Sequence, residues 1–187
     1  MSDTIKKILK IVGISLVAVF GLIIIAMFVV DTDFSTARSV EIERPNEVVF
    51  DYIRHLRNHN DFTVWSDMDP DMEQEFRGTD GTVGFVWAWR GSEEVGSGEQ
   101  EIVSITEDER IDLKLRFIEP FESSSDVYMI TEALSENQTR VTWGFEGKMP
   151  RPMNLMLLFM DMEQLIGEDY ETGLANLKTV LETEGDR

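Results

Sequence analysis

One segment constrains this chain more than any other: residues 11–30 follow one another without a single charged side chain. A helix rises about 1.5 Å per residue, so this segment would be about 30 Å long, which matches the hydrocarbon core of a bilayer. A cleaved signal peptide has a shorter apolar core and a small-residue cleavage site. Here Val30 is followed directly by Asp31. The sequence therefore predicts an uncleaved transmembrane helix over residues 11–30.

The charges on either side of this segment predict its orientation. Lys6, Lys7 and Lys10 precede the segment, and Asp31 and Asp33 follow it. Basic residues collect on the cytoplasmic side of membrane spans. We therefore expect a single-pass protein with a cytoplasmic N-terminus and an extracytoplasmic domain, which would be periplasmic in a Gram-negative cell.

The chain as a whole is strongly acidic. It has 36 Asp and Glu residues against 17 Lys and Arg residues, and its formal net charge is −19. Such a surface repels phosphate backbones, so we expect no nucleic-acid partner. Cysteine is absent, which excludes disulfides, thiolate catalysis and cysteine-bound zinc. A domain of about 150 residues can hold a hydrophobic core without such cross-links.

Beyond the apolar segment, the alternation of apolar and polar residues predicts a sheet. A strand over 38–43 precedes Pro45, where a helix can start and run to about Arg57, and an irregular stretch over 58–70 follows. Further strands are expected over 74–77, 82–90, 99–105, 111–117, 126–133 and 141–145. The short turns between them indicate an antiparallel meander with one apolar face.

The end of the chain offers a cover for that apolar face. Apolar residues recur there at spacings of three and four: Ile166, Tyr170, Leu174, Leu177 and Leu181. This pattern predicts a long amphipathic helix over about 161–182. Gly167 and Gly173 lie within it, and each costs about 1 kcal/mol relative to Ala. Close packing or free space at these two positions would explain them.

The expected fold class is α+β, a curved antiparallel sheet that grips a long C-terminal helix behind one N-terminal transmembrane helix. The expected parts are a cytoplasmic N-terminus over 1–10, the transmembrane helix over 11–30, a linker over 31–37, one α+β domain over 38–183 and a tail over 184–187.

Several short motifs support a more specific interpretation. They lie at residues 44–53, 65–66, 81–84, 95–98, 139–143, 153–156 and 166–178. In this order the sequence resembles the START-like, or SRPBCC, superfamily, and within it the polyketide cyclase/dehydrase and lipid-transport family, including a subfamily of membrane-anchored members. The resemblance covers about residues 36–183. It implies a helix-grip fold that binds a hydrophobic small molecule between the sheet and the long helix.

Aromatic residues on the expected inward face are the candidate ligand-binding residues. Together with two methionines, the set is Trp65, Phe85, Trp87, Trp89, Phe117, Trp143, Phe145, Met156, Met160 and Tyr170. Ligand pockets are mostly apolar and aromatic, but the same residues could equally fill a closed core. Methionine adapts its shape to different partners. Met156 and Met160, four residues apart, could therefore form a gate beside the cavity or touch the bilayer.

The sequence offers no candidate for catalytic or metal chemistry. His55 and His59 are too few for a zinc site, and both are predicted to be surface residues. Asp67, Asp69 and Asp71 begin like a calcium loop, but the glycine and glutamate that such a loop requires are replaced. No serine lies in a nucleophile-elbow motif. We therefore expect no metal, no cofactor and no catalytic residue.

Three functions remain open from the sequence. The leading one is noncatalytic binding of a hydrophobic or lipid-like small molecule close to a membrane. The second is a cyclase or dehydratase acting on a polyketide-like substrate, which requires a polar residue buried in the cavity. The third is an interaction module for a membrane protein partner, in which the core is filled and closed.

Overall fold

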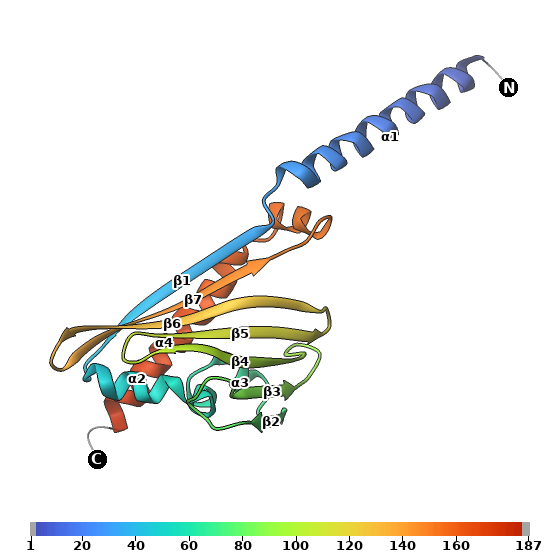
Figure 1. Cartoon of the computed structure of the whole chain (residues 1–187). Helices are drawn as coiled ribbons and strands as arrows, with labels where there is room; N and C mark the ends of the chain where they lie inside the picture. The colour runs from blue at the N-terminus through green and yellow to red at the C-terminus, as the bar shows by residue number, and fades with distance from the viewer. Residues whose placement is uncertain (1–2, 185–187) are drawn as a thin grey trace. The chain divides into compact units, whose positions relative to one another are not determined.

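The structure, a computed structural model, describes residues 3–184, which form two compact units (Figure 1). One unit contains the N-terminal residues up to Asp33 together with residues 149–161. The other contains residues 34–148 and the C-terminal part from Met162 onward. The chain therefore passes between the two units three times.

Helix α1 (Asp3–Val29) dominates the first unit. From Lys7 to Val29 it is long and apolar enough to cross a membrane, and none of this stretch is buried. The expected span over 11–30 lies almost entirely within it, although Val30 falls just beyond the helix end. A short 3-10 helix, η2 (Met153–Leu158), completes this unit.

The second unit is built on a seven-stranded antiparallel sheet with the strand order β1-β7-β6-β5-β4-β3-β2. Its strands are β1 (Asp33–Ile42), β2 (Glu73–Arg77), β3 (Val86–Arg90), β4 (Ser97–Thr106), β5 (Arg110–Glu119), β6 (Ser123–Ser135) and β7 (Gln138–Lys148). From β2 to β7 each strand lies beside the next one in the chain, so this part is the expected meander.

Helices cover one face of this sheet. Helix α2 (Asn46–Arg54), the 3-10 helix η1 (Leu56–Asp61) and helix α3 (Val64–Met68) follow one another between β1 and β2. The long helix α4 (Met162–Glu184) runs across the same face (Figure 1). The structure thus confirms the α+β helix-grip architecture and places α4 within two residues of its predicted bounds.

The pattern of buried residues explains the sheet. In β7, Val141, Trp143 and Phe145 are buried, as the alternation predicts. In β6, Val127 and Met129 point inward. These side chains meet Tyr170, Leu174, Leu177 and Leu181 of α4 in one hydrophobic core.

Three predicted boundaries were wrong. Strand β1 begins at Asp33 rather than residue 38, and Phe34 stacks on Phe145 with 5.7 Å between ring centroids. The strand predicted over 82–90 begins only at Val86, because Gly81 and Gly84 adopt positive φ and turn the chain. Val83, which the alternation with Phe85 and Trp87 over 82–90 predicts to face inward, is exposed. The helix predicted to run to about Arg57 ends at Arg54, because His55 has an extended backbone.

Close packing explains the two glycines inside α4. A Cβ atom at Gly173 would lie 2.9 Å from Cζ3 of Trp143, and a Cβ atom at Gly167 would clash with the guanidinium of Arg38. Both positions let a large side chain from the sheet approach the helix backbone. The helix propensity lost at these glycines is therefore offset by contacts between α4 and the sheet.

Candidate ligand-binding cavity

A cavity lies between the sheet and the segments that cover it. Its lining comes from five strands, from the η1–α3 region, from two loops and from α4: His59, Thr63, Trp65, Met72, Trp87, Trp89, Val95, Gln100, Leu115, Phe117, Val127, Trp143 and Tyr170. Most of these residues are apolar or aromatic, which is the composition of small-molecule sites in general.

Strand register builds the floor of the cavity. Gln100 of β4 is paired with Trp87 of β3 on one side and with Leu115 of β5 on the other. Because paired residues point to the same face of a sheet, these three side chains stand in one row across the strands. The floor is therefore a product of register, and a shift by one residue in any of these strands would remove it.

Gly98 makes room for the next row. It is paired with Trp89 on one side and Phe117 on the other. A Cβ atom at Gly98 would lie 2.7 Å from Cζ2 of Trp89, so the indole ring covers the glycine. As a result Trp89 and Phe117 meet edge to face, with ring centroids 5.9 Å apart. The glycine thus allows two large rings from non-adjacent strands to form one wall.

A second group of rings joins the sheet to α4. Trp143 stacks on Tyr170 with a centroid distance of 4.1 Å and an interplanar angle of 12°. Trp65 of α3 stands edge-on to both, at 6.1 Å from Trp143 and 6.3 Å from Tyr170. Aromatic pairs in these geometries contribute about 0.5–1.5 kcal/mol beyond their buried area. The three rings fix one side of the cavity.

The free space is small. The volume open to the centre of a water-sized sphere is about 70 Å³. One water molecule requires roughly 10–15 Å³ on this measure, so the cavity has room for a few waters or a small ring. A full lipid chain would fit only if the walls moved apart.

The cavity wall holds two buried donors without partners. Nε1 of Trp87 and Nε1 of Trp143 are buried, and no acceptor within residues 3–184 reaches either of them. A buried N–H without an acceptor costs about 1–3 kcal/mol. Gln100 adds a buried amide to the same lining, and Tyr170 adds a hydroxyl. Burial, followed by the charge of Asp169, raises the pKa of Tyr170, so its hydroxyl stays protonated.

His59 is a buried member of the lining, and the prediction that it lies on the surface was wrong. Its side chain is only 1% exposed, and its Nε2 lies 2.8 Å from the carbonyl oxygen of Ile53. Burial lowers the pKa of His59 to about 4, although the Ile53 carbonyl acts in the opposite direction. The ring is therefore neutral at pH 7, and Nε2–H donates to Ile53 while Nδ1 keeps its lone pair.

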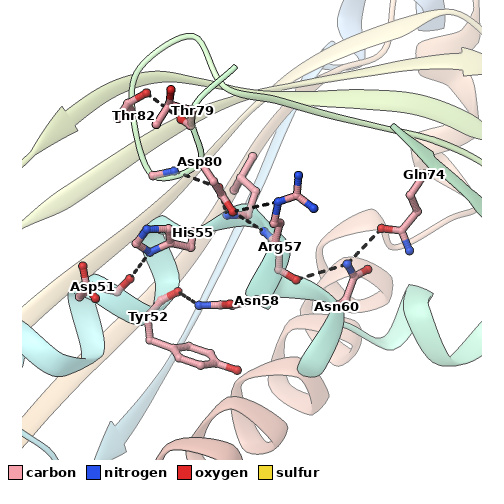
Figure 2. A network of polar contacts seen from close by, with 12 residues as sticks. Asp51, Tyr52, His55, Arg57, Asn58, Asn60, Gln74, Thr79, Asp80 and Thr82 are labelled. Carbon is pink, nitrogen blue, oxygen red and sulfur yellow. Dashed lines mark hydrogen bonds and ion pairs between the residues drawn. The ribbon is translucent and has the colours of Figure 1, made fainter. Parts of the chain in front are cut away.

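A polar network holds the wall that carries His59 (Figure 2). The carboxylate of Asp80 accepts hydrogen bonds from the backbone N–H groups of Leu56, at 2.9 Å, and Arg57, at 3.3 Å. Asp80 thereby caps the start of η1 from a distant loop, as a helix N-terminus requires. Asn60 continues the network by donating to the Arg57 carbonyl and to Gln74. These bonds tie η1 to the loop before β3 and to β2.

The structure brings six of the ten predicted site residues to this cavity: Trp65, Trp87, Trp89, Phe117, Trp143 and Tyr170. Phe85 and Phe145 are buried but lie outside the lining, since Phe85 stacks on Phe76 and Phe145 on Phe34. Met156 and Met160 belong to the other compact unit and do not line the cavity. The methionine gate therefore stays a prediction.

Sequence reasoning missed the polar part of the lining. Gln100 lies between Gly98 and Ile102 on the inward face of β4, so a polar residue at an inward position was the available signal. His59 and Thr63 lie where the sequence has no periodicity, and nothing in the pattern indicated their burial. Among residues 3–184, no group of three or more histidine and acidic side chains could hold a metal ion.

Comparison with known proteins agrees with this arrangement. The helix-grip fold with an internal cavity is the architecture of a ligand-binding domain, and residues 33–182 match the family described as polyketide cyclase / dehydrase and lipid transport. The chain belongs to this family. No match was found among the curated proteins.

Solved structures share the fold at low sequence identity. A protein from Nitrosospira multiformis is 16% identical, with a TM-score of 0.58, and the match covers 82% of this chain and 100% of that one. The protein XoxI from Bacillus cereus is 17% identical, with a TM-score of 0.58 and coverages of 80% and 97%. Mll3558 from Rhizobium loti is 20% identical, with a TM-score of 0.58 and coverages of 79% and 96%. These similarities show the fold.

Proposed function

We propose that this protein binds a hydrophobic small molecule in the cavity beneath α4 and holds that site close to a membrane. The observation that carries the proposal is the lining itself, in which the rings of Trp87, Trp89, Phe117 and Trp143 face free space rather than a filled core. Tightly packed interiors have few voids larger than a water molecule. Membership of a family described by lipid transport and polyketide chemistry supports the same function.

The ligand on this proposal is apolar but carries at least one hydrogen-bond acceptor. The indole N–H groups of Trp87 and Trp143 are buried without acceptors, and a carbonyl, ether or hydroxyl oxygen would satisfy them. A pure hydrocarbon would leave both groups unpaired. The available volume favours a ring or a short chain of modest size, and a longer molecule requires movement of the wall.

Binding without chemistry fits the polar residues better than catalysis does. A cyclase or dehydratase requires an acid or base poised near neutral pH. His59 has a pKa of about 4 and is a weak base, and the raised pKa of Tyr170 makes that hydroxyl a weak acid. Neither group is adjusted for proton transfer at pH 7, so on this proposal the ligand leaves the cavity unchanged.

The membrane part of the proposal rests on α1. Its stretch from Lys7 to Val29 has the length and hydropathy of a span and no buried residue. Lysines before it and aspartates after it support a cytoplasmic N-terminus and an extracytoplasmic domain. Protease added outside intact spheroplasts should then degrade the domain, and complete protection would contradict this orientation.

Native mass spectrometry tests the binding site. The solved protein from Nitrosospira multiformis matches this domain over its full length, which supports expressing residues 33–184 without α1. The fragment, purified from its own host without detergent, should carry a reproducible bound mass that organic extraction releases unchanged. A ligand that the fragment had chemically altered would favour the second hypothesis, an enzyme of the cyclase or dehydratase type. An empty, folded fragment that takes up no apolar probe would favour an interaction module for a membrane protein.

A pair of valine variants provides the control. Val95 lines the cavity from the loop before β4, whereas Val83 is exposed on a neighbouring loop and does not line it. Val95→Trp should fill the cavity and remove the bound mass, and Val83→Trp should leave the bound mass in place. Circular dichroism on both variants confirms folding. Retention of the ligand by a folded Val95→Trp variant would place the site elsewhere.

A further inference from the structure

The segment 149–161 exposes large apolar side chains although it lies far from α1 in the sequence. Phe159 is 88% exposed, and four other apolar side chains of the segment are exposed with it: Met153, Met156, Leu158 and Met160. A soluble surface carries single exposed apolar residues, but a cluster of this kind marks a contact with a partner or a membrane.

This segment is fastened to the C-terminal end of α1. The Nδ2 amide of Asn154 donates to the carbonyl oxygens of Met27, at 3.0 Å, and Val30, at 2.9 Å. Arg151 donates from Nε to the same Met27 oxygen at 2.9 Å, and its guanidinium lies 5.3 Å from the centre of the Phe28 ring. The last carbonyls of a helix have no partner within the helix. Here side chains of the segment supply the partners.

The backbone reinforces the attachment. The N–H of Met149 donates to the carbonyl of Thr32 at 2.7 Å, directly after the end of α1. Asn154 is fully buried, so its hydrogen bonds to the helix end are shielded from competing water. The segment therefore keeps a fixed position beside residues 27–32, where the apolar part of α1 gives way to Asp31 and Asp33.

Charge distinguishes this segment from the rest of the acidic chain. Residues 149–160 include no acidic residue and Arg151 is their only charged side chain, so Asp161 at the end of the segment is its one carboxylate. The 36 acidic residues of the protein would repel anionic headgroups, whereas this stretch does not contribute to that repulsion. Arginine near the end of a span commonly extends toward the headgroups while its stem stays in apolar surroundings.

We propose that segment 149–161 lies in the interface of the bilayer that α1 crosses, with Phe159 and its methionine and leucine neighbours at the boundary between headgroups and acyl chains. The proposal rests on the membrane anchoring by α1 proposed above. A segment bonded to the helix end at the bilayer surface has lipid as its nearest apolar partner. The protein then contacts the membrane through two elements that are more than 100 residues apart in the sequence.

The absence of cysteine makes a direct test possible. Three single-cysteine variants of the full chain, Phe159→Cys, Val17→Cys and Phe121→Cys, are labelled with an NBD fluorophore and reconstituted into phosphatidylcholine vesicles. Phe121 is an exposed phenylalanine in the turn between β5 and β6 and serves as the matched control. Nitroxide lipids, with the quencher placed either shallow or deep in the acyl chain, report contact with lipid in both leaflets.

The label at residue 159 should lose at least half of its emission, and the shallow nitroxide should quench it more than the deep one. The label at residue 17 should be quenched best by the deep nitroxide, and the label at residue 121 should be unaffected. Quenching at 17 without quenching at 159 would overturn the interfacial segment and leave the anchor intact. No quenching at 17 would overturn the anchor itself. Unquenched emission at 159 that shifts to the blue as protein density rises would instead assign the segment to contact with a second copy.

Discussion

Two halves of the interface between sheet and helices are built from different side chains. Around α2 and the C-terminal half of α4, aliphatic residues fill the space, and none is more than 1% exposed: Ile42, Val49, Ile53, Leu56, Ile111, Leu113, Val141, Leu174 and Leu177. Around the N-terminal half of α4, rings predominate, and they surround a cavity of about 70 Å³. The aliphatic side chains pack closely, as in an ordinary protein interior, whereas the stacked and edge-on rings border the free space.

The difference separates stability from binding. The aliphatic half satisfies the ordinary rules of a core, because its side chains are apolar and closely packed. The aromatic half departs from these rules of core packing, because it contains free volume, two unpaired indole N–H groups and a buried histidine. Local departures from good packing and full hydrogen bonding are expected where a protein binds something. Variants in each half should therefore affect different properties.

The largest expected effect is a loss of unfolding free energy caused by a substitution in the aliphatic half. Leu177 of α4 is fully buried, so Leu177→Ala should lower the free energy of unfolding by about 2–5 kcal/mol through lost burial and a new cavity. Urea denaturation of the 33–184 fragment measures the loss. Binding of an apolar probe by the remaining folded molecules should be unchanged. A variant that keeps its stability but loses the probe would contradict the division into two halves.

A smaller, pH-dependent change in the free energy of unfolding is expected from His59, which lies where the cavity wall meets the core. The folded-state pKa of His59 is about 4 against 6.5 for an unperturbed histidine, so the unfolded chain binds the proton first. The contribution of His59 to stability is therefore present above pH 6.5 and is lost as the pH falls toward 4. The full loss of unfolding free energy from this cause is about 3 kcal/mol. Part of this loss develops above the pH range in which the carboxylates take up protons.

Denaturation curves between pH 7 and pH 5 separate this contribution from acid unfolding in general. His59→Gln should flatten the decline in unfolding free energy over that range, because glutamine takes up no proton. His55→Gln, which removes the half-buried histidine beside η1, should retain the decline. Equal slopes in the wild type and His59→Gln would show that His59 is not buried in its neutral form.

The sequence predicted the sheet face and the long helix well, because both depend on local periodicity. Alternation in β5 and β7 and the spacing in α4 identified Leu113, Trp143 and Leu177 as inward-facing. Periodicity gives the face of a residue but not its position along that face. For this reason Phe85 and Phe145 were assigned to the cavity with Trp87 and Trp143, although tertiary packing places them outside it.

The rest of the site depends on contacts between distant segments. His59 is buried because Asp80, in a loop more than 20 residues away, caps η1 and holds it against the sheet. No local pattern encodes that contact. Likewise Met156 lies with α1 because Asn154 and Arg151 bond to the Met27 carbonyl, a pairing that sequence spacing does not reveal. Only the resemblance to a family indicated that the rings would surround a space.

The smallest expected effect is a change in ligand affinity, and it distinguishes the contribution of an aromatic ring from that of its hydrogen-bonding N–H group. Trp87→Phe keeps a ring in the cavity wall but removes one of the two unpaired donors. It should weaken binding of acetophenone, whose carbonyl can accept that hydrogen bond, by about tenfold, or about 1.4 kcal/mol. Binding of ethylbenzene, which has similar size and no acceptor, should change much less. Titration followed by NMR chemical shifts measures both affinities on the 33–184 fragment.

Trp89→Phe is the matched control for this prediction. Trp89 lines the same cavity, but its indole nitrogen is not one of the buried, unpaired atoms. Its replacement should therefore change the affinities for acetophenone and ethylbenzene by similar factors. If Trp87→Phe also weakened both probes equally, the cavity would select its ligand by shape alone, and the aromatic half would differ from the aliphatic half only in its free volume. Selective loss of acetophenone would instead make hydrogen bonding the second property that distinguishes the two halves.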